Sequence, residues 1–560
     1  MTEQQRRIQN MLDRLDELTF IEANIEAEFE YIDNAPYKTG HAPETQDWQP
    51  LQKHQLFGGI DKHFWIKGVF KTPATPDQHK RLILNILTGR EGRGDTLNPQ
   101  GIVYLNGEMT QGVDVNHHEI ALEYDTEYTL LYYLYTGSES AKPFSLDFNF
   151  AYIDGRLEKY YYDLLVPFQV CNMLDTADQN YIQMMTVLEN SFDFLKTSDM
   201  TSEEFFDSLS AASQFLEDEF YTALCSRENK PIVNCIGHTH IDVEWLWTRH
   251  QTREKIQRSF ATAAQLMKEY PEYKFMLSQP ELYRYLKEEA PEKYAELKAL
   301  IEQKRWEPEG AMYLEADCNL ISGESMVRQI LLGKKFFKDE FGADCKILFL
   351  PDVFGYSAAM PQILNKAGIR HFVTSKISWN DTNTMPNDTF MWQGIDGSEI
   401  FTNFITTQEY TNPPERNTTY VGMLTPSHVK GTWSRYSNKG YASRSFTSFG
   451  YGDGGGGPTK KMLETYRRLN RGIPTMPVTE MTFLLPHLDK VRAEFDKNCI
   501  KNKETPKWVG ELYLEFHRGT YTSMAKNKRA NRKSEFALGL CEALSYTDLL
   551  GGGNYDADGI

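Results

Sequence analysis

The chain has 560 residues, a length that allows three or four domains of about 150 residues each. Its 60 lysines and arginines stand against 78 aspartates and glutamates, so the formal charge is −18. Such an acidic chain is a poor partner for nucleic acid or an anionic membrane surface. Apolar residues make up 40% and charged residues 25%, proportions that exclude wholesale disorder.

The sequence also indicates a compartment. It contains no run of about 18 apolar residues, so we expect no transmembrane helix. The first 20 residues are polar and lack the apolar core of a secretory signal. The seven cysteines are scattered and form no CxxC pair, which favours free thiols in a reducing compartment. We therefore expect a cytoplasmic protein.

The first part of the chain is predicted to be a β-sandwich flanked by helices. Residues 1–30 are predicted to form a polar amphipathic helix, and residues 160–225 have a helical pattern. Between them, short runs of β-branched and aromatic residues alternate with turns, which predicts an antiparallel sandwich. The Asn106-Gly107 pair predicts a hairpin turn. The predicted strands are 63–70, 81–89, 101–108 and 128–135.

From about residue 230, strand-like and helix-like segments alternate, which predicts a parallel α/β layer or barrel. The apolar run 231–237 predicts a buried strand. Ile256, Phe260, Ala263 and Met267 are spaced by four, three and four residues, as on one face of a helix. Residues 460–550 are predicted to be mostly helical. Further strands are predicted at 274–277, 311–317, 346–352 and 371–377.

The strongest local motif is Gly237-His238-Thr239-His240-Ile241-Asp242, which follows the apolar run directly. Alternate residues of an extended segment point the same way, so His238, His240 and Asp242 can share one face. Imidazole and carboxylate together suit a first-row metal, and zinc fits that pair. The alternative is a strand end that carries solvated histidines.

Two further acids follow predicted secondary structure. Asp352 ends an apolar strand, where it can bind a metal, attack a substrate or do both; the alternative is a cap on the next helix.

Asp453 lies in the segment 449–458, which formally matches GxGxxG. An acid there would repel a pyrophosphate, and Pro458 stands where a helix should donate N–H groups. A lone acid in a pliable loop can instead donate a proton; the alternative is a flexible surface turn.

Two aromatic residues lie close to these acids in the sequence. Trp245 is three residues after Asp242, and Phe354 is two after Asp352. Their rings can pack on the C–H faces of a sugar, or they can belong to the core. Trp247 and Trp379 are predicted to serve only in packing.

Five segments, in this order, resemble the retaining α-mannosidases of glycoside hydrolase family 38, above all the cytosolic and bacterial branch. The resemblance extends over about residues 225–550 and more loosely over the sandwich. The segments are HTHIDVEW (238–245), FLPDVFGYS (349–357), SKISWNDTN (375–383), GYGDGGGGPT (450–459) and EFHRGTYTS (515–523).

The resemblance implies a multidomain fold with a helix and a β-sandwich over residues 1–225. It implies a central seven-stranded α/β barrel over residues 226–475, and an incomplete C-terminal helical bundle over residues 476–560. It also implies a zinc ion, a covalent mannosyl intermediate and an α-mannoside or mannose-containing oligosaccharide as substrate. A homo-oligomer is expected as one form of assembly in this branch.

The resemblance also assigns roles to single residues. His240 and Asp242 match zinc ligands, Asp352 matches the carboxylate that is both zinc ligand and nucleophile, and Asp453 matches the acid/base. The remaining matches are Trp245 and Phe354 around the bound mannose, Lys376 and Tyr521 near the sugar, and His238 behind the ligands.

One departure from the family pattern is expected to matter. The family supplies a fourth zinc ligand from a histidine in a QFHD-like segment, and residues 525–560 contain no histidine. We therefore expect a chain truncated before that ligand and the C-terminal β domains, with weaker zinc binding and impaired activity. The alternatives are another zinc-dependent hydrolase, of amidohydrolase or deacetylase type, and an inactive mannoside-binding protein.

Overall fold

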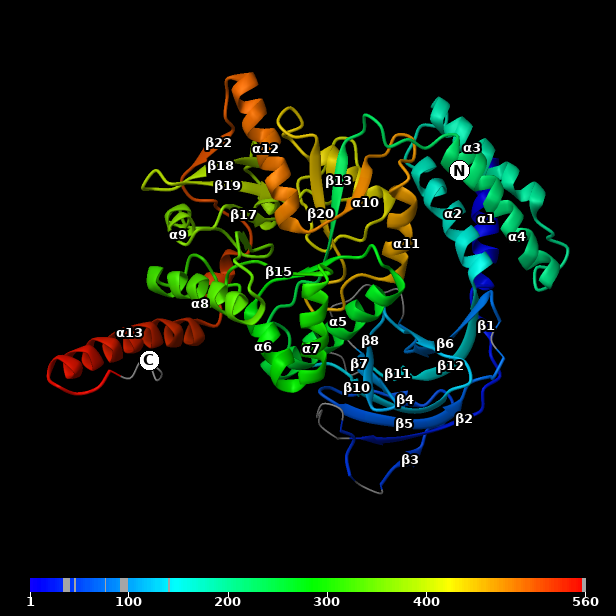
Figure 1. Ribbon diagram of the computed structural model, residues 1–560, viewed down its shortest axis with the longest axis horizontal. Helices are drawn as coiled ribbons and strands as arrows, with labels where there is room; N and C mark the ends of the chain where they lie inside the picture. Colours follow the sequence, from blue (N-terminus) through cyan, green and yellow to red (C-terminus); the bar gives the residue numbers. More distant parts are fainter. Residues whose placement is uncertain (34–40, 45–46, 76, 91–98, 139–141, 556–560) are drawn as a thin grey trace.

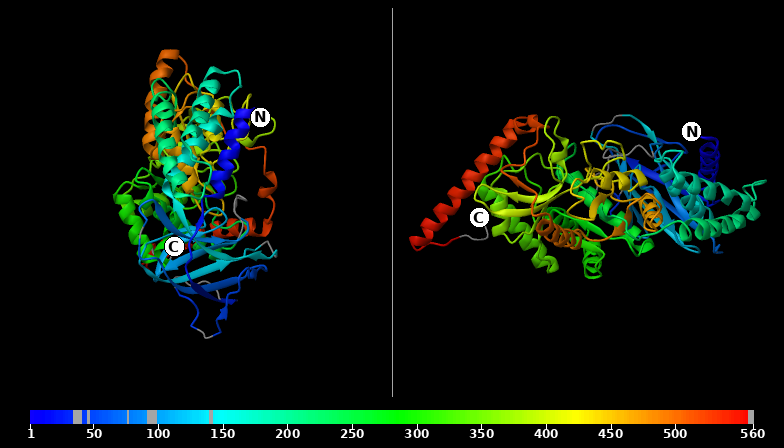
Figure 2. Two further views of the ribbon diagram at one scale, coloured as in Figure 1. Left: turned by 90° about the vertical axis from the view of Figure 1, so that its right-hand side faces the viewer. Right: turned by 90° about the horizontal axis from the view of Figure 1, so that it is seen from above.

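The structure is a computed structural model that describes residues 1–33, 41–44, 47–75, 77–90, 99–138 and 142–555. An antiparallel sandwich and a group of helices form one side of the molecule, and mixed α/β layers form the other (Figure 1). The long helix α13 (Ala525–Leu550) lies at the opposite end of the molecule from the N-terminal helices (Figure 2). No helix in the described part of the chain is long and apolar enough to cross a membrane.

The N-terminal helix is shorter than predicted. Helix α1 (Glu3–Glu17) begins with a capping box between Thr2 and Gln5 and buries Ile8, Leu12 and Leu15. The chain then turns into strands β1 (Ile21–Glu22) and β2 (Ala27–Asp33). The prediction of a helix to residue 30 was wrong because β2 gains its stability from pairing with a distant strand, β5 (His63–Lys71).

Two antiparallel sheets form the sandwich, and the four predicted strands are all present. One sheet has the order β1, β12 (Asp147–Asp154), β6 (Lys80–Leu87), β9 (Glu119–Leu122). The other has the order β3 (Gln49–Pro50), β2, β5, β10 (Glu127–Tyr135), β7 (Gln100–Leu105), β8 (Glu108–Val113). Strands β4 (Leu56–Phe57) and β11 (Phe144–Ser145) form a short separate pair.

The sandwich is stabilised by apolar side chains that the two sheets bury between them, among them Ile66, Leu84 and Tyr132. The predicted hairpin turn joins β7 to β8: Asn106 and Gly107 have φ of +52° and +82°, as a type I′ turn requires. Helices then lead away from the sandwich. They are α2 (Gly155–Cys171), α3 (Gln179–Asn190), η1 (Ser191–Phe194), α4 (Glu203–Leu216) and η2 (Glu217–Thr222).

Two five-stranded sheets form the centre of the α/β part. The first contains β15 (Trp306–Pro308), β14 (Phe275–Leu277), β13 (Ile232–His238), β20 (Arg444–Phe449) and β21 (Val478–Met481), all parallel. The second contains β16 (Ile347–Phe349), β17 (His371–Thr374), β19 (Glu399–Phe404), β18 (Thr389–Gln393) and β22 (Lys507–Val509). In the second sheet, β18 runs antiparallel to β19.

The predicted seven-stranded barrel is not confirmed in this form. Among the described residues, a single parallel bridge from Gly310 to Leu348 links the two sheets. No strand forms over residues 311–317; the strand there, β15, ends at Pro308. The remaining helices pack around these sheets: α5 (Arg249–Glu269), α6 (Pro280–Glu289), α7 (Pro291–Glu302), α8 (Gly323–Phe341), α9 (Met360–Lys366), η3 (Lys376–Trp379), α10 (Pro426–Arg435) and α11 (Lys460–Leu469).

The predicted helical bundle over residues 476–560 is not confirmed either. Strands β21 and β22 from this segment pair with β13 and β18 in the two central sheets. Helix α12 (Leu484–Asn502) buries Leu488 and Phe495 against those sheets, whereas α13 buries none of its described residues. The helical pattern was therefore correct for α12 and α13, but these helices do not form a shared bundle core.

Helix α5 confirms the predicted apolar face and shows a second buried side. Ile256, Phe260, Ala263 and Met267 are all at most 3% exposed. Strand β8 of the sandwich covers another side so closely that a Cβ atom on Gly112 would lie 2.0 Å from the Cγ atom of Arg258. Helix α5 therefore links the sandwich to the central sheets.

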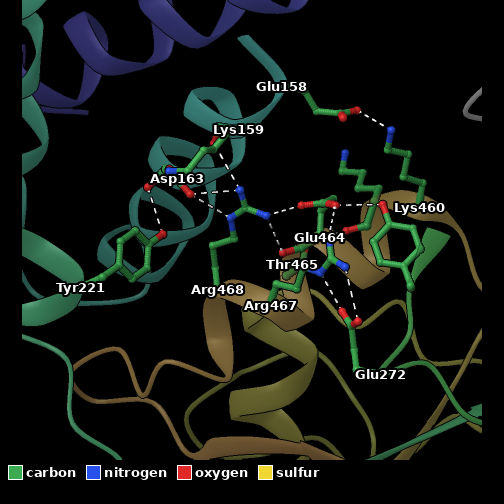
Figure 3. A network of polar contacts seen from close by, with 12 residues as sticks. Glu158, Lys159, Asp163, Tyr221, Glu272, Lys460, Glu464, Thr465, Arg467 and Arg468 are labelled. Atoms are coloured by element: carbon green, nitrogen blue, oxygen red, sulfur yellow. Dashed lines mark hydrogen bonds and ion pairs between the residues drawn. The ribbon is translucent and has the colours of Figure 1, made fainter. Parts of the chain in front are cut away.

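A charged network joins the N-terminal helices to the α/β part, between α2 and α11 (Figure 3). Arg468 Nε donates to Asp163 Oδ1 over 3.0 Å, and the same guanidinium pairs with Glu464. The hydroxyl of Tyr221 donates to the carbonyl oxygen of Asp163 over 3.1 Å. Arg468 is 8% and Asp163 5% exposed, and a charge left alone at such a depth is costly.

We predict that Arg468→Met lowers the free energy of unfolding by about 3–5 kcal/mol, because two buried carboxylates lose their shared cation. The matched control is Arg471→Met. Arg471 pairs with Glu217 through side chains that are 41% and 36% exposed, where a pair contributes about 1 kcal/mol or less. Thermal unfolding of both variants checks this, and equal losses would contradict it.

Candidate active site

The candidate acids and histidines lie where parallel strands end. His240 and Asp242 follow β13, Asp352 follows β16, and Asp453 follows β20. The carboxyl ends of parallel strands share one edge of a sheet, and the loops beyond them carry the chemistry in α/β folds. Residues more than 200 positions apart in the sequence therefore meet at one place.

The four side chains converge. One possible ligand atom from each of His240, Asp242, Asp352 and Asp453 lies within 4.8 Å of the others. His240 Nε2 is 3.3 Å from Asp242 Oδ1 and 4.0 Å from Asp352 Oδ2. His240 is buried, whereas the three acids are partly exposed, so the cluster opens to solvent on its acidic side.

The loop that carries Asp453 has a defined place in the structure. Asp453 has a φ of +59°, an unusual value for a residue other than glycine. The N–H of Asp242 donates to the carbonyl oxygen of Asp453 over 2.9 Å. The hydroxyl of Tyr420 donates to Asp453 Oδ1 over 2.9 Å. Because Gly454 to Gly457 are also buried, the segment is not a flexible surface turn.

A lysine supplies positive charge within the cluster. Lys376 Nζ is 2.6 Å from Asp352 Oδ1 and 4.2 Å from the centroid of the Trp379 ring. Lys376 is only 6% exposed, so water screens this pair weakly. The lysine therefore forms an ion pair with one oxygen of Asp352, while His240 lies nearer the other.

The second ring nitrogen of His240 faces another acid. His240 Nδ1 is 3.6 Å from Glu315 Oε1, and neither atom has a hydrogen-bond partner among the described residues. Burial opposes a charge on the imidazole, but Glu315 and Asp242 raise the pKa of His240 well above its usual range. The surroundings of His240 therefore favour a positive charge.

Burial is the main reason why the pKa of Asp453 is raised, and the nearby Asp242 and Asp352 carboxylates add to the effect. His240 and the Tyr420 hydroxyl act in the opposite direction. A raised pKa favours the protonated form of the carboxyl group, which is the form that a general acid needs.

The two aromatic residues singled out in the sequence follow cluster residues closely along the chain. Trp245 is 54% exposed, and its ring meets Trp247 edge-on at 5.6 Å. The ring of Phe354 lies 4.7 Å from that of His517. Trp247, which we expected only to pack, donates from Nε1 to the carbonyl oxygen of Asp242 over 2.9 Å, so it also fixes the backbone of a cluster residue.

Two predicted residues lie farther from the cluster's centre. The hydroxyl of Tyr521 donates to the carbonyl oxygen of Phe354 over 2.5 Å and accepts from Asn319 Nδ2 over 2.8 Å, so it holds the Phe354 backbone. The ring of His238 packs edge-on against Phe349, and its Nε2 has no hydrogen-bond partner among the described residues. His238 is not among the four residues whose ligand atoms converge.

Sequence reasoning missed Glu315, Tyr420 and the bond from Trp247. Glu315 lies in the segment 311–317, which was interpreted as a strand, and Tyr420 lies outside every motif. Their places beside His240 and Asp453 depend on contacts across more than 30 residues of sequence. The one signal in the sequence for Glu315 was that it is an acidic residue near the end of the predicted strand 311–317.

A separate cavity lies outside the cluster. A cavity of about 530 Å³ between the sandwich, α2, α5 and α11 is lined in part by His117, Tyr451 and Lys460, and by none of the four cluster residues. The chemistry of the titratable cluster, and not the size of this cavity, identifies the candidate active site.

The donor set fits a divalent metal. One buried imidazole and three carboxylates offer nitrogen and oxygen ligands, the combination that first-row metals accept. Carboxylates this close together repel one another unless a cation lies among them. The residues present could therefore hold a metal ion.

Residues 230–511 match the N-terminal domain of glycosyl hydrolases family 38. This match extends over half of the chain and contains all four cluster residues. The chain therefore belongs to glycosyl hydrolase family 38.

The chain is also similar to named α-mannosidases. It is 40% identical to alpha-mannosidase G of Dictyostelium discoideum over 339 residues, which are 60% of this chain and 29% of that protein. It is 39% identical to human alpha-mannosidase 2C1 over 320 residues, 57% of this chain and 29% of that protein. It is 36% identical to alpha-mannosidase of Saccharomyces cerevisiae over 376 residues, which are 66% of this chain and 32% of that protein. The similarity spans less than a third of each relative.

We predict that Asp453→Asn raises the thermal stability of the metal-free protein at neutral pH. A raised pKa in the folded state means that the ionised carboxylate disfavours folding. This cost is absent below the ordinary pKa of aspartate, near pH 4, and grows as the pH rises toward the raised value. The gain should therefore be present at pH 7 and absent near pH 4.

Unfolding temperatures at the two pH values check this prediction. Asp381→Asn is the control, because Asp381 is exposed and lies outside the cluster. A loss of stability in Asp453→Asn at pH 7 would show that the ionised form of Asp453 stabilises the fold.

Proposed function

We propose that this chain hydrolyses terminal α-linked mannose with retention of configuration. The observation that carries the proposal is the approach of Asp352 and Asp453, with carboxylate oxygens within 4.8 Å of each other beside His240 and Asp242. Retaining glycosidases place their two carboxyl groups about 5–5.5 Å apart. Membership of family 38 and the names of the relatives supply the choice of mannose.

In the first step, an Asp352 oxygen attacks the anomeric carbon while the bond to the leaving oxygen breaks. Asp453 gives its proton to that oxygen, and a covalent mannosyl ester on Asp352 results. In the second step, the ionised Asp453 takes a proton from water, whose oxygen attacks the anomeric carbon and releases Asp352. Lys376, 2.6 Å from Asp352 Oδ1, holds the carboxylate in place by an ion pair.

We propose zinc as the metal, held by His240, Asp242 and Asp352. When bound, zinc would act as a template for sugar hydroxyls beside the nucleophile. Its ligand His240 must be neutral to bind a metal. The buried Glu315, 3.6 Å from His240 Nδ1, is placed to accept the proton of that nitrogen and so direct Nε2 toward the metal.

The surroundings of the cluster support a sugar as substrate. Trp245 offers an exposed ring, and Phe354 lies beside Lys376 at the same edge. Aromatic faces pack on the C–H groups of sugars, and the acidic charge of the chain disfavours phosphate-rich partners. A cytoplasmic location, a homo-oligomeric state and the absence of nucleic-acid and membrane partners remain predictions.

We predict that Asp453→Asn and Asp352→Asn each lower kcat/KM for an aryl α-mannoside. The loss for Asp453→Asn should be about 10²–10⁴-fold, the usual contribution of a general acid, and that for Asp352→Asn at least as large. A 2-deoxy-2-fluoro mannosyl donor should leave an adduct on a peptide that contains Asp352, detectable by mass spectrometry.

The same experiment separates the alternatives. An amidohydrolase or deacetylase activates water and would form no adduct on Asp352 while it cleaves an amide or ester. Binding of a mannoside with neither adduct nor turnover, in zinc-loaded protein, would favour a binding protein. Either result would overturn the proposed function.

A further prediction concerns metal binding. Glu315→Gln should weaken zinc binding by about 10–100-fold, the usual effect of losing a carboxylate behind a metal-bound histidine. Competition with a chromophoric chelator measures this without any substrate. Glu302→Gln, on the exposed surface of α7, is the control, and equal affinities for both variants would exclude a role for Glu315.

A further inference from the structure

Helix α5 holds the backbone of the loop that carries Asp453. Arg258 Nη2 donates to the carbonyl oxygen of Gly454 over 2.6 Å. The N–H of Gly456 donates to Ser259 Oγ over 2.9 Å. Arg258 is 4% and Ser259 2% exposed, so both side chains are shielded from water. Their bonds hold the loop backbone at Gly454 and at Gly456.

The N-terminal sandwich holds the same loop from a second direction. His117 Nε2 lies 2.8 Å from the carbonyl oxygen of Pro458, and its Nδ1 lies 2.9 Å from Asp114 Oδ1. Both partners are acceptors, so the ring donates to both only when each nitrogen carries a hydrogen. Asp114 also pairs with Arg258 through its other oxygen. One buried carboxylate thus connects the two contacts with the loop.

Two glycines of the loop leave no room for a Cβ atom next to this network. A Cβ atom on Gly455, where φ is +81°, would lie 2.4 Å from Ser259 Oγ. A Cβ atom on Gly456, where φ is +103°, would lie 3.1 Å from Asp114 Oδ2. Any side chain at either position would displace the loop from Arg258 and Asp114, so these glycines permit the close approach that the network needs.

We propose that Asp114, His117 and Arg258 form a clamp that positions Asp453 for proton transfer, so that the sandwich is part of the catalytic machinery. These three are positioning residues: His117 and Arg258 contact carbonyl oxygens of the loop, and Asp114 acts through its contacts with these two side chains. Asp453 has a φ of +59°, and such a conformation persists only where the surroundings hold it. The expected effect on proton transfer rests on the proposed role of Asp453. The expected effect on the position of the loop backbone, which we call the mechanical consequence, does not.

The mechanical consequence is tested by hydrogen exchange. In His117→Ala and Asp114→Asn, exchange of the amides in a peptide covering residues 450–459 should rise about tenfold or more. Ser259→Ala, which removes one bond to Gly456, provides a milder variant that should give a smaller rise. The control is His118→Ala, because His118 bonds to Asn85 within the sandwich and not to the loop.

The catalytic consequence is tested by the dependence of kcat/KM on the leaving group. Loss of proton donation should lower kcat/KM for phenyl α-mannoside about 10²-fold in His117→Ala. The value for 2,4-dinitrophenyl α-mannoside, whose leaving group needs no proton, should change less than about threefold. A residue that only stabilises the fold would lower both values equally.

The outcomes distinguish the clamp from the proposed function. Unchanged loop exchange in both His117→Ala and Asp114→Asn would overturn the clamp, as would a rise spread over the whole chain or equal losses with both substrates. A wild-type chain with no mannosidase activity, together with raised exchange confined to the loop, would overturn the proposed function and support the mechanical clamp.

Discussion

The central constraint on this structure is the meeting of three carboxylates around one buried imidazole. Asp242, Asp352 and Asp453 share a space of a few ångströms with His240, and the Asp242 and Asp352 carboxylates help to raise the pKa of Asp453. Lys376 forms an ion pair with Asp352, and a bound cation would reduce the repulsion among the carboxylates. The carboxyl ends of parallel strands bring these groups together, so the site depends on the sheets that carry them.

The second constraint is that the acid loop lies between two parts of the chain. Helix α5 is covered on one side by β8 and on others by the central sheets, so a buried arginine and a buried aspartate can meet there. A buried ion pair is weak evidence for stability by itself, because desolvation offsets much of the attraction. Arg258 of this pair also bonds to the loop backbone at Gly454, and the role that we propose for the pair is to help place Asp453.

Local patterns predicted much of the fold. Short runs of β-branched and aromatic residues identified the sandwich strands, the spacing in α5 identified its buried face, and Asn106-Gly107 identified a hairpin turn. Two differences involve distant partners. Strand β2 pairs with β5 where a helix to residue 30 was expected, and β21 from the segment 476–560 pairs with β13. The pattern of a short segment can fit both a helix and a strand, so its contacts with distant segments decide which of the two forms.

The sequence by itself identified the candidate residues for the chemistry: His240, Asp242, Asp352 and Asp453 lie just after strands, and their motifs are local. Only the tertiary structure decided what surrounds them. Glu315, Tyr420 and His117 become neighbours of the site through contacts between residues far apart in the chain. Hydrogen bonds and ion pairs act over a few ångströms in space, and no spacing along the chain specifies that distance.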